Sequence, residues 1–164
     1  MINILIADDH ALIREGLKKI LNSEPDMTVV GEANNVAELF KALERLVVNI
    51  VLLDITMPGE SGLDALKELR QKYPHVPVLI LSFHPEHRFA VRALKAGAAG
   101  YLTKESAAEE VVQAIRKVIQ RAAVERVWVA GGEIVSLNPV RKSLEELFLE
   151  VTSEATAKVP GGVH

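Results

Sequence analysis

The chain has 164 residues, of which 49% are hydrophobic and 25% are charged, a balance typical of a soluble globular domain with room for a small appendage. Its formal net charge of -3 gives no overall electrostatic reason to expect nucleic acid, because phosphate backbones usually select a basic patch or stripe. Since it contains no cysteine, disulfides, thiolate metal sites and a cysteine nucleophile are excluded.

The amino-terminal segment does not resemble a secretion signal. It lacks a basic region, and the apolar run from Ile2 stops at Asp8. No apolar stretch approaches the roughly 20 residues that span a bilayer. We therefore expect a cytoplasmic protein with no membrane partner.

Apolar runs alternate with amphipathic stretches through about residue 120, which is the pattern of βα units on a parallel sheet. Residues 50–53 form the most continuous apolar run, as expected for a central strand buried on both faces. The expected strands are residues 3–7, 28–33, 50–53, 78–81 and 99–102, and the expected helices are residues 11–21, 36–43, 63–69, 86–95 and 106–119. The predicted fold class is α/β, a doubly wound five-stranded parallel sheet flanked by five helices.

The pattern changes near the carboxyl end. Residues 124–130, a Gly131-Gly132 turn and residues 133–137 are typical of a β-hairpin, and a short helix capped by Ser143 follows. We accordingly expect a first domain over residues 1–122, a small extension of hairpin and helix over residues 123–155, and a flexible tail over residues 156–164. Because a two-stranded hairpin is marginal alone, it should dock on the first domain, on its own helix or across a dimer.

Acidic side chains follow two of the expected strands: Asp8 and Asp9 follow the first, and Asp54 follows the third. In open α/β sheets, ligands bind beyond the carboxyl ends of the strands. Three carboxylates crowded there repel one another unless a cation neutralises them, and Mg²⁺ fits because it takes oxygen ligands and leaves positions for water and a phosphoryl oxygen. The alternative is that Asp9 merely caps the helix that follows it.

Two further polar residues stand at the same predicted edge, since Ser82 closes the fourth strand and Lys104 follows the fifth. An ammonium is a good point-charge partner for phosphate, and a hydroxyl can hydrogen-bond one of its oxygens. Taken singly, Lys104 would be a solvated loop lysine and Ser82 a turn former.

Taken together, these segments resemble the response-regulator receiver family, the CheY-like domains of two-component signalling, which share a flavodoxin-like sheet. The matching text is ILIADDH at residues 4–10, IVLLDITMPGESGLDAL at 50–66, VLILS at 78–82 and AGAAGYLTKES at 96–106. The segments agree in order and spacing over roughly the first 120 residues.

The resemblance implies that Asp54 is the phosphoacceptor and that Asp8 and Asp9 hold Mg²⁺ together with Asp54. The backbone carbonyl of Thr56 is implied as a further metal ligand. On this interpretation the protein is a phosphoacceptor signalling protein and not an enzyme beyond its self-phosphorylation and slow self-dephosphorylation.

The resemblance also implies that Ser82 and Lys104 contact the aspartyl phosphate and that Tyr101 is the switch aromatic, which moves when Ser82 does. Many receivers have proline after the lysine, whereas Glu105 stands here. That departure points to the subgroup that usually carries a LuxR-type helix-turn-helix. Residues 121–164, with five basic and six acidic side chains, offer neither the room nor a basic recognition helix, so we expect no DNA binding by this chain.

The implied partners are a sensor histidine kinase and, as a further possibility, a second copy of the chain. Two alternatives remain open: a receiver-like interaction module that does not respond to phosphate, and a metal-dependent phosphohydrolase with an aspartate nucleophile. Such hydrolases usually present Asp-x-Asp after the first strand. His10, His84 and His87 are not expected to bind metal, because Mg²⁺ prefers oxygen and no zinc spacing is present; His10 is instead expected to tune access to the pocket.

Overall fold

The computed structural model describes residues 1–84 and 87–129, and the predictions for residues beyond 129 lie outside these described residues. The strands are β1 (Ile2–Ala7), β2 (Met27–Ala33), β3 (Ile50–Asp54), β4 (Val78–Ser82) and β5 (Gly100–Thr103). The helices are α1 (Ala11–Asn22), α2 (Val36–Arg45), α3 (Gly62–Lys72), α4 (His87–Lys95) and α5 (Ala107–Val129). Each expected strand is present and differs by at most one residue at either end.

The five strands are parallel and lie in the order β2-β1-β3-β4-β5, so β3 is central as expected. Each residue of β3 is buried. The chain runs outward from β1 to β2 and then crosses back to β3, so the strand order reverses between β1 and β3. The predicted α/β fold class is confirmed for the described residues.

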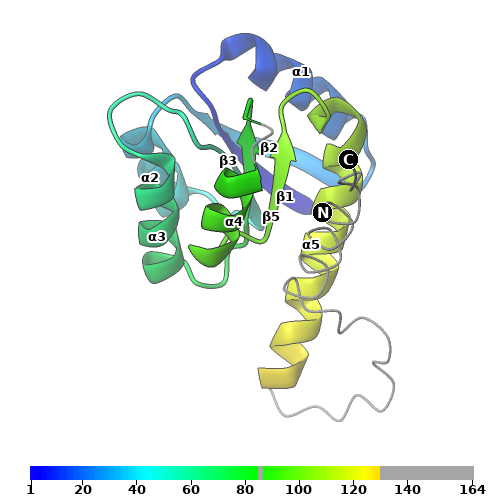
Figure 1. Cartoon of the computed structure of the whole chain (residues 1–164). Helices are drawn as coiled ribbons and strands as arrows, with labels where there is room; N and C mark the ends of the chain where they lie inside the picture. The colour runs from blue at the N-terminus through cyan, green and yellow to red at the C-terminus, as the bar shows by residue number, and fades with distance from the viewer. Residues whose placement is uncertain (85–86, 130–164) are drawn as a thin grey trace, which may run out of the picture. The chain divides into compact units, whose positions relative to one another are not determined.

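Helices cover both faces of the sheet, with α2, α3 and α4 on one face and α1 and α5 on the other (Figure 1). Because successive residues of a strand point to opposite faces, β3 contributes Val51 and Leu53 to the first core cluster and Ile50 and Leu52 to the second. The first cluster includes Leu39, Leu66, Leu69 and Ala93 from the helices, and the second includes Leu17, Leu21, Val111 and Ile115. Because the sheet is packed against helices on both faces, the ends of its strands, which carry the polar residues, are held in position.

The helix α5 continues to Val129, across residues for which we expected the first hairpin strand, so that part of the prediction was wrong. The β-branched residues there favour strand only weakly, and extending a helix that has already formed adds one hydrogen bond per residue without a new nucleation cost. The expected turn, the second hairpin strand, the Ser143-capped helix and the tail lie outside the described residues. Within the described part of the chain, no helix combines the length and the apolar character needed to cross a bilayer.

An ion cluster ties α5 to the loop before β2. The Arg116 guanidinium lies 2.7 Å from Glu24 Oε2 and 3.0 Å from Asp26 Oδ1. The hydrogen bonds from Arg116 hold the pKa of Asp26 below its usual range. The helix α5 is therefore anchored at a defined place on the face of the sheet that it covers.

Candidate functional site

The polar residues predicted from the strand ends meet at one edge of the sheet. Asp8 follows β1, Asp54 and Ser82 are the last residues of β3 and β4, and Lys104 follows β5. Asp8, Asp54 and Ser82 are fully buried, and Lys104 is only 6% exposed. Charged groups are rarely buried unless they are paired, so this arrangement calls for a partner for each charge.

Lys104 supplies that partner to two carboxylates. Its Nζ lies 2.8 Å from Asp8 Oδ2 and 3.0 Å from Asp54 Oδ2. The contact with Asp54 is a hydrogen bond, whereas Asp8 Oδ2 accepts no hydrogen bond of suitable geometry from the described residues and interacts with the ammonium through charge alone. One buried acceptor thus has unused hydrogen-bonding capacity.

Asp54 is held as a carboxylate. Burial raises its pKa, but hydrogen bonds outweigh that effect: the Thr56 N–H donates to Oδ1 over 2.9 Å, Lys104 donates to Oδ2, and the Thr56 hydroxyl donates to Oδ1 over 3.0 Å. The net result is a pKa below the usual range. The side chain is ionised at neutral pH, as a nucleophile or metal ligand must be.

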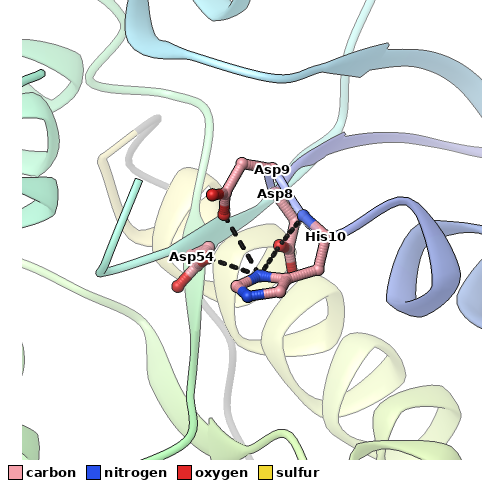
Figure 2. A group of neighbouring side chains, drawn as sticks. All are labelled: Asp8, Asp9, His10 and Asp54. Carbon is pink, nitrogen blue, oxygen red and sulfur yellow. Dashed lines mark hydrogen bonds and ion pairs between the residues drawn. The ribbon is translucent and has the colours of Figure 1, made fainter. Parts of the chain in front are cut away.

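The acidic cluster includes an imidazole that faces its oxygens. Figure 2 shows His10 turned toward Asp8, Asp9 and Asp54, with Nδ1 lying 2.9 Å from Asp8 Oδ1, 3.1 Å from Asp9 Oδ1 and 3.6 Å from Asp54 Oδ2. The His10 N–H also donates to Asp8 Oδ1 over 2.8 Å, which fixes the turn after β1. His10 itself is the N-cap residue of α1, so the alternative in which Asp9 caps that helix is wrong.

These residues fit a metal ion. One ligand atom from each of Asp8, Asp9, His10 and Asp54 can be chosen so that all lie within 4.8 Å of one another. The donor set is mainly carboxylate oxygen, which hard divalent cations prefer, and the buried Asp8 Oδ2 has no hydrogen bond to lose. The implied role of the Thr56 carbonyl stays a prediction.

The loop after β3 depends on a glycine that allows close backbone approach. A Cβ added at Gly62 would lie 2.5 Å from the Ile55 carbonyl oxygen, so only glycine fits where α3 begins. Gly62 also donates its N–H to that carbonyl over 3.3 Å. This contact folds the loop back beside Asp54.

Ser82 and Tyr101 both contact the same residue in the loop after β4. The Ser82 hydroxyl accepts a hydrogen bond from the His84 N–H over 3.0 Å, and the Tyr101 hydroxyl donates to the His84 carbonyl over 2.6 Å. Their expected roles as phosphate contact and switch stay predictions. The shared partner provides a physical connection between them.

Phe83 is a site residue that sequence reasoning missed. Its ring centre lies 4.6 Å from Lys104 Nζ and 5.3 Å from the His10 ring, which it meets edge to face. The side chain is 47% exposed, so it lies at the solvent side of the cluster. The only available signal was its place directly after Ser82, and a single phenylalanine at a strand end is usually a packing residue.

Residues 4–116 match the family described as response regulator receiver domain. The transcriptional regulatory protein DegU of Brevibacillus brevis is 40% identical over 122 residues, which cover 74% of this chain and 52% of DegU. Response regulator UvrY of Escherichia coli K12 is 41% identical over 118 residues, which cover 72% of this chain and 54% of UvrY. The chain spans about half the length of these relatives.

Solved structures show the same similarity. A two-component response regulator of the LuxR family from Aurantimonas sp. SI85-9A1 superposes with a TM-score of 0.68 at 34% identity, over 76% of this chain and 97% of that one. The response regulator domain of Thermotoga maritima CheB superposes with a TM-score of 0.67 at 30% identity, over 73% and 97% of the two chains. In both cases nearly all of the chain in the solved structure is covered.

Proposed function

The chain belongs to the response regulator receiver domain family, whose members are signalling proteins, and we propose that it acts as a phosphorylation-driven switch in which Asp54 accepts the phosphoryl group. The observation that carries this proposal is the placement of Asp54 at the end of the central strand, ionised and in contact with Lys104. A carboxylate with a cation beside it is a competent nucleophile toward phosphorus. Cytoplasmic location remains the expectation for such a protein.

In the proposed step, one oxygen of Asp54 attacks the phosphorus of a phosphohistidine on a sensor histidine kinase. A phosphorus–oxygen bond forms, the phosphorus–nitrogen bond breaks, and the nitrogen keeps the electron pair. Because the phosphohistidine ring reacts with a proton already on its other nitrogen, the leaving group is a neutral imidazole. Lys104 then contacts the transferred group, and the Ser82 hydroxyl hydrogen-bonds one of its oxygens. The protein's contribution is mainly position and charge, as in other phosphoryl transfers.

Mg²⁺ is the proposed cofactor. Asp8, Asp9, Asp54 and the Thr56 carbonyl would hold it, and when bound it supplies positive charge that offsets the negative charge of the phosphoryl oxygens. The hydrogen-bonding capacity left at Asp8 Oδ2 and the oxygen-rich donor set support this assignment.

The proposed output is a change of surface. If Ser82 turns toward the phosphoryl group, its hydroxyl no longer accepts the hydrogen bond from the His84 N–H. The loop after β4, whose His84 carbonyl accepts a hydrogen bond from the Tyr101 hydroxyl, is then free to move. Phosphorylation favours the rearranged state because only that state hydrogen-bonds the added group. The surface formed by α4, β5 and α5 would then bind a partner or a second copy of the chain, and we expect no DNA binding by the described residues.

The test is intact-mass measurement after incubation with acetyl phosphate and Mg²⁺, on the wild type and on Asp54→Ala. The wild type should gain the mass of one phosphoryl group, and Asp54→Ala should gain none. Asp64→Ala, which removes an exposed carboxylate on α3, is the matched control and should behave as the wild type. No gain in the wild type would favour an interaction module that ignores phosphate, and steady release of phosphate in large excess over protein would favour a hydrolase.

A further inference from the structure

The Lys104 ammonium is buried, although it lies next to side chains that reach the solvent. The Lys104 side chain has no exposed surface, whereas His10 is 43% exposed and Asp9 is 29% exposed. Phe83, which is 47% exposed, lies on this solvent side with its ring centre 4.6 Å from Lys104 Nζ. From this arrangement we propose that Phe83 is a positioning residue: its ring covers the Lys104 ammonium, keeps water out of the site and so lengthens the lifetime of a phosphoryl group on Asp54.

The ammonium has three polar neighbours and one aromatic neighbour. Its Nζ lies 2.8 Å from Asp8 Oδ2, 3.0 Å from Asp54 Oδ2 and 3.1 Å from His10 Nδ1. The fourth neighbour is the face of the Phe83 ring, whose π electrons attract a cation. A water molecule that approached the ammonium from the solvent side would have to displace this ring.

Two contacts hold the Phe83 ring in place. The ring meets the His10 ring edge to face, with 5.3 Å between the ring centres and 84° between the planes. Phe83 also lies inside a closed turn, because the Ser82 hydroxyl accepts a hydrogen bond from the His84 N–H over 3.0 Å. Among the described residues, Phe83 belongs to neither core cluster, so the ring can be replaced without a cavity in the core.

A neutral ring covers the ammonium without competing for its hydrogen bonds. A water molecule in the same place would offer an acceptor to the Lys104 N–H groups, whereas the ring offers no lone pair. Lys104 therefore keeps its hydrogen bond to Asp54 Oδ2. Exclusion of water also lowers the local dielectric constant, which strengthens the attraction between the ammonium and the oxygens around it.

The effect on lifetime rests on the proposed function. Hydrolysis ends the phosphorylated state when a water oxygen attacks the phosphorus: a new phosphorus–oxygen bond forms, the bond to the Asp54 oxygen breaks, and the carboxylate keeps the electron pair. The products are the Asp54 carboxylate and hydrogen phosphate, and the second proton of the water passes to the solvent. A ring that keeps water from the Lys104 ammonium also limits the access of water to a phosphoryl group in contact with that ammonium, so hydrolysis is slowed.

The first measurement follows the exchange of the Lys104 ammonium protons with water by NMR. It uses the full chain at near-neutral pH and low temperature, without phosphodonor or Mg²⁺. Phe83→Ala removes the ring and Phe83→Tyr keeps its face, while Phe40→Ala is the matched control because it removes a ring whose centre lies 5.0 Å from another ammonium, that of Lys72. We expect exchange at Lys104 to accelerate about threefold or more in Phe83→Ala, the factor expected for the loss of one cation–π contact, and to stay within about twofold of the wild type in the other two variants.

The second measurement follows the loss of the phosphoryl group by intact mass after acetyl phosphate is removed. Phe83→Ala should lose the group about threefold faster or more, and Phe83→Tyr should stay within about twofold of the wild type. The initial rate of phosphorylation by acetyl phosphate should not fall in Phe83→Ala, because Lys104 keeps its contacts with both buried carboxylates.

An exchange rate or a lifetime that stays within about twofold of the wild type in Phe83→Ala would overturn the inference, as would a Phe83→Tyr variant that behaves like Phe83→Ala. Slower phosphorylation of Phe83→Ala would also overturn it, since the ring would then assist the transfer itself. The exchange measurement needs no phosphodonor and so separates the two proposals. A wild type that gains no phosphoryl group, with faster exchange in Phe83→Ala, would sink the proposed function alone, and the reverse pattern would sink this inference alone.

Discussion

Lys104 provides the sharpest test of how the site is held together. In Lys104→Met the aliphatic stem is roughly kept and the ammonium is lost, which leaves the Oδ2 atoms of Asp8 and Asp54 buried without the cation that now lies 2.8 and 3.0 Å away. At an effective dielectric constant of about 20, two unit charges about 3 Å apart attract by roughly 5–6 kcal/mol. Part of this is offset because the substitution also removes the cost of burying the ammonium.

We therefore expect the free energy of unfolding to fall by about 3–5 kcal/mol, the range found when one partner of a buried ion pair is removed. For a chain of this size, the midpoint of thermal unfolding should drop by roughly 6–20 °C. The assay is urea and thermal unfolding in buffer treated with a chelator. At one fixed concentration, Mg²⁺ should stabilise Lys104→Met more than the wild type, because the variant has lost the competing positive charge and should bind the ion more tightly; at about 100 times the variant's dissociation constant the gain is about 2.7 kcal/mol.

Lys67→Met is the matched control. The Lys67 side chain is 64% exposed, and its Nζ lies 3.8 Å from Asp64 Oδ1 on the same helix. Its removal should therefore lower the free energy of unfolding by no more than about 1 kcal/mol. If Lys104→Met unfolds within about 1 kcal/mol of the wild type, or if Mg²⁺ stabilises it no more than the wild type, the ammonium does not neutralise the cluster as argued.

Two further predictions concern the loop and the acceptor. Gly62→Ala would place a Cβ 2.5 Å from the Ile55 carbonyl oxygen and should reduce the free energy of unfolding by about 1–3 kcal/mol. Gly16→Ala, whose added Cβ would have nothing within 4 Å, should raise the free energy of unfolding by about 0.4–1 kcal/mol. Urea unfolding of the two variants tests this difference, and equal effects would contradict it. Since the folded pKa of Asp54 lies below its unfolded value, its carboxylate contributes stability above about pH 4 that is lost as the pH falls through the folded pKa. The difference in unfolding free energy between wild type and Asp54→Asn should change across that acid range, and a difference that stays constant from neutral pH down through it would refute the argument.

The sheet was predictable because its strands are buried on both faces and its helices follow a regular apolar spacing. A strand that is buried on both faces has an unbroken run of apolar residues in its sequence, as β3 does. The run ends at the edge of the sheet, where a polar residue is needed, and in β3 that residue is Asp54. Parallel strands bring their carboxyl ends together, which is why Asp8 and Lys104 could be placed beside Asp54 despite their separation in sequence. The resemblance to receiver domains, stated from the motifs, is confirmed by the family match over residues 4–116.

Side-chain orientation and helix length were not predictable in the same way. The inward turn of His10 follows from the local turn held by Asp8 Oδ1 and from a tertiary contact with the Phe83 ring, and neither contact leaves a periodic trace in the sequence. The extension of α5 reflects helix propagation across residues whose local preference is for strand. Both misses lie where neighbouring structure decides between options that the local sequence leaves open.

The charge of the site explains why a divalent cation is integral to the proposed function. Asp8, Asp9 and Asp54 bring three formal negative charges, and Lys104 brings one positive charge, so the formal charges of these four side chains leave an excess of two negative charges. A phosphoryl group, with a charge of about -1.5 to -2 at pH 7, would meet repulsion there. One divalent ion brings the cluster close to zero, so it allows the phosphoryl group to approach as well as stabilising its transfer.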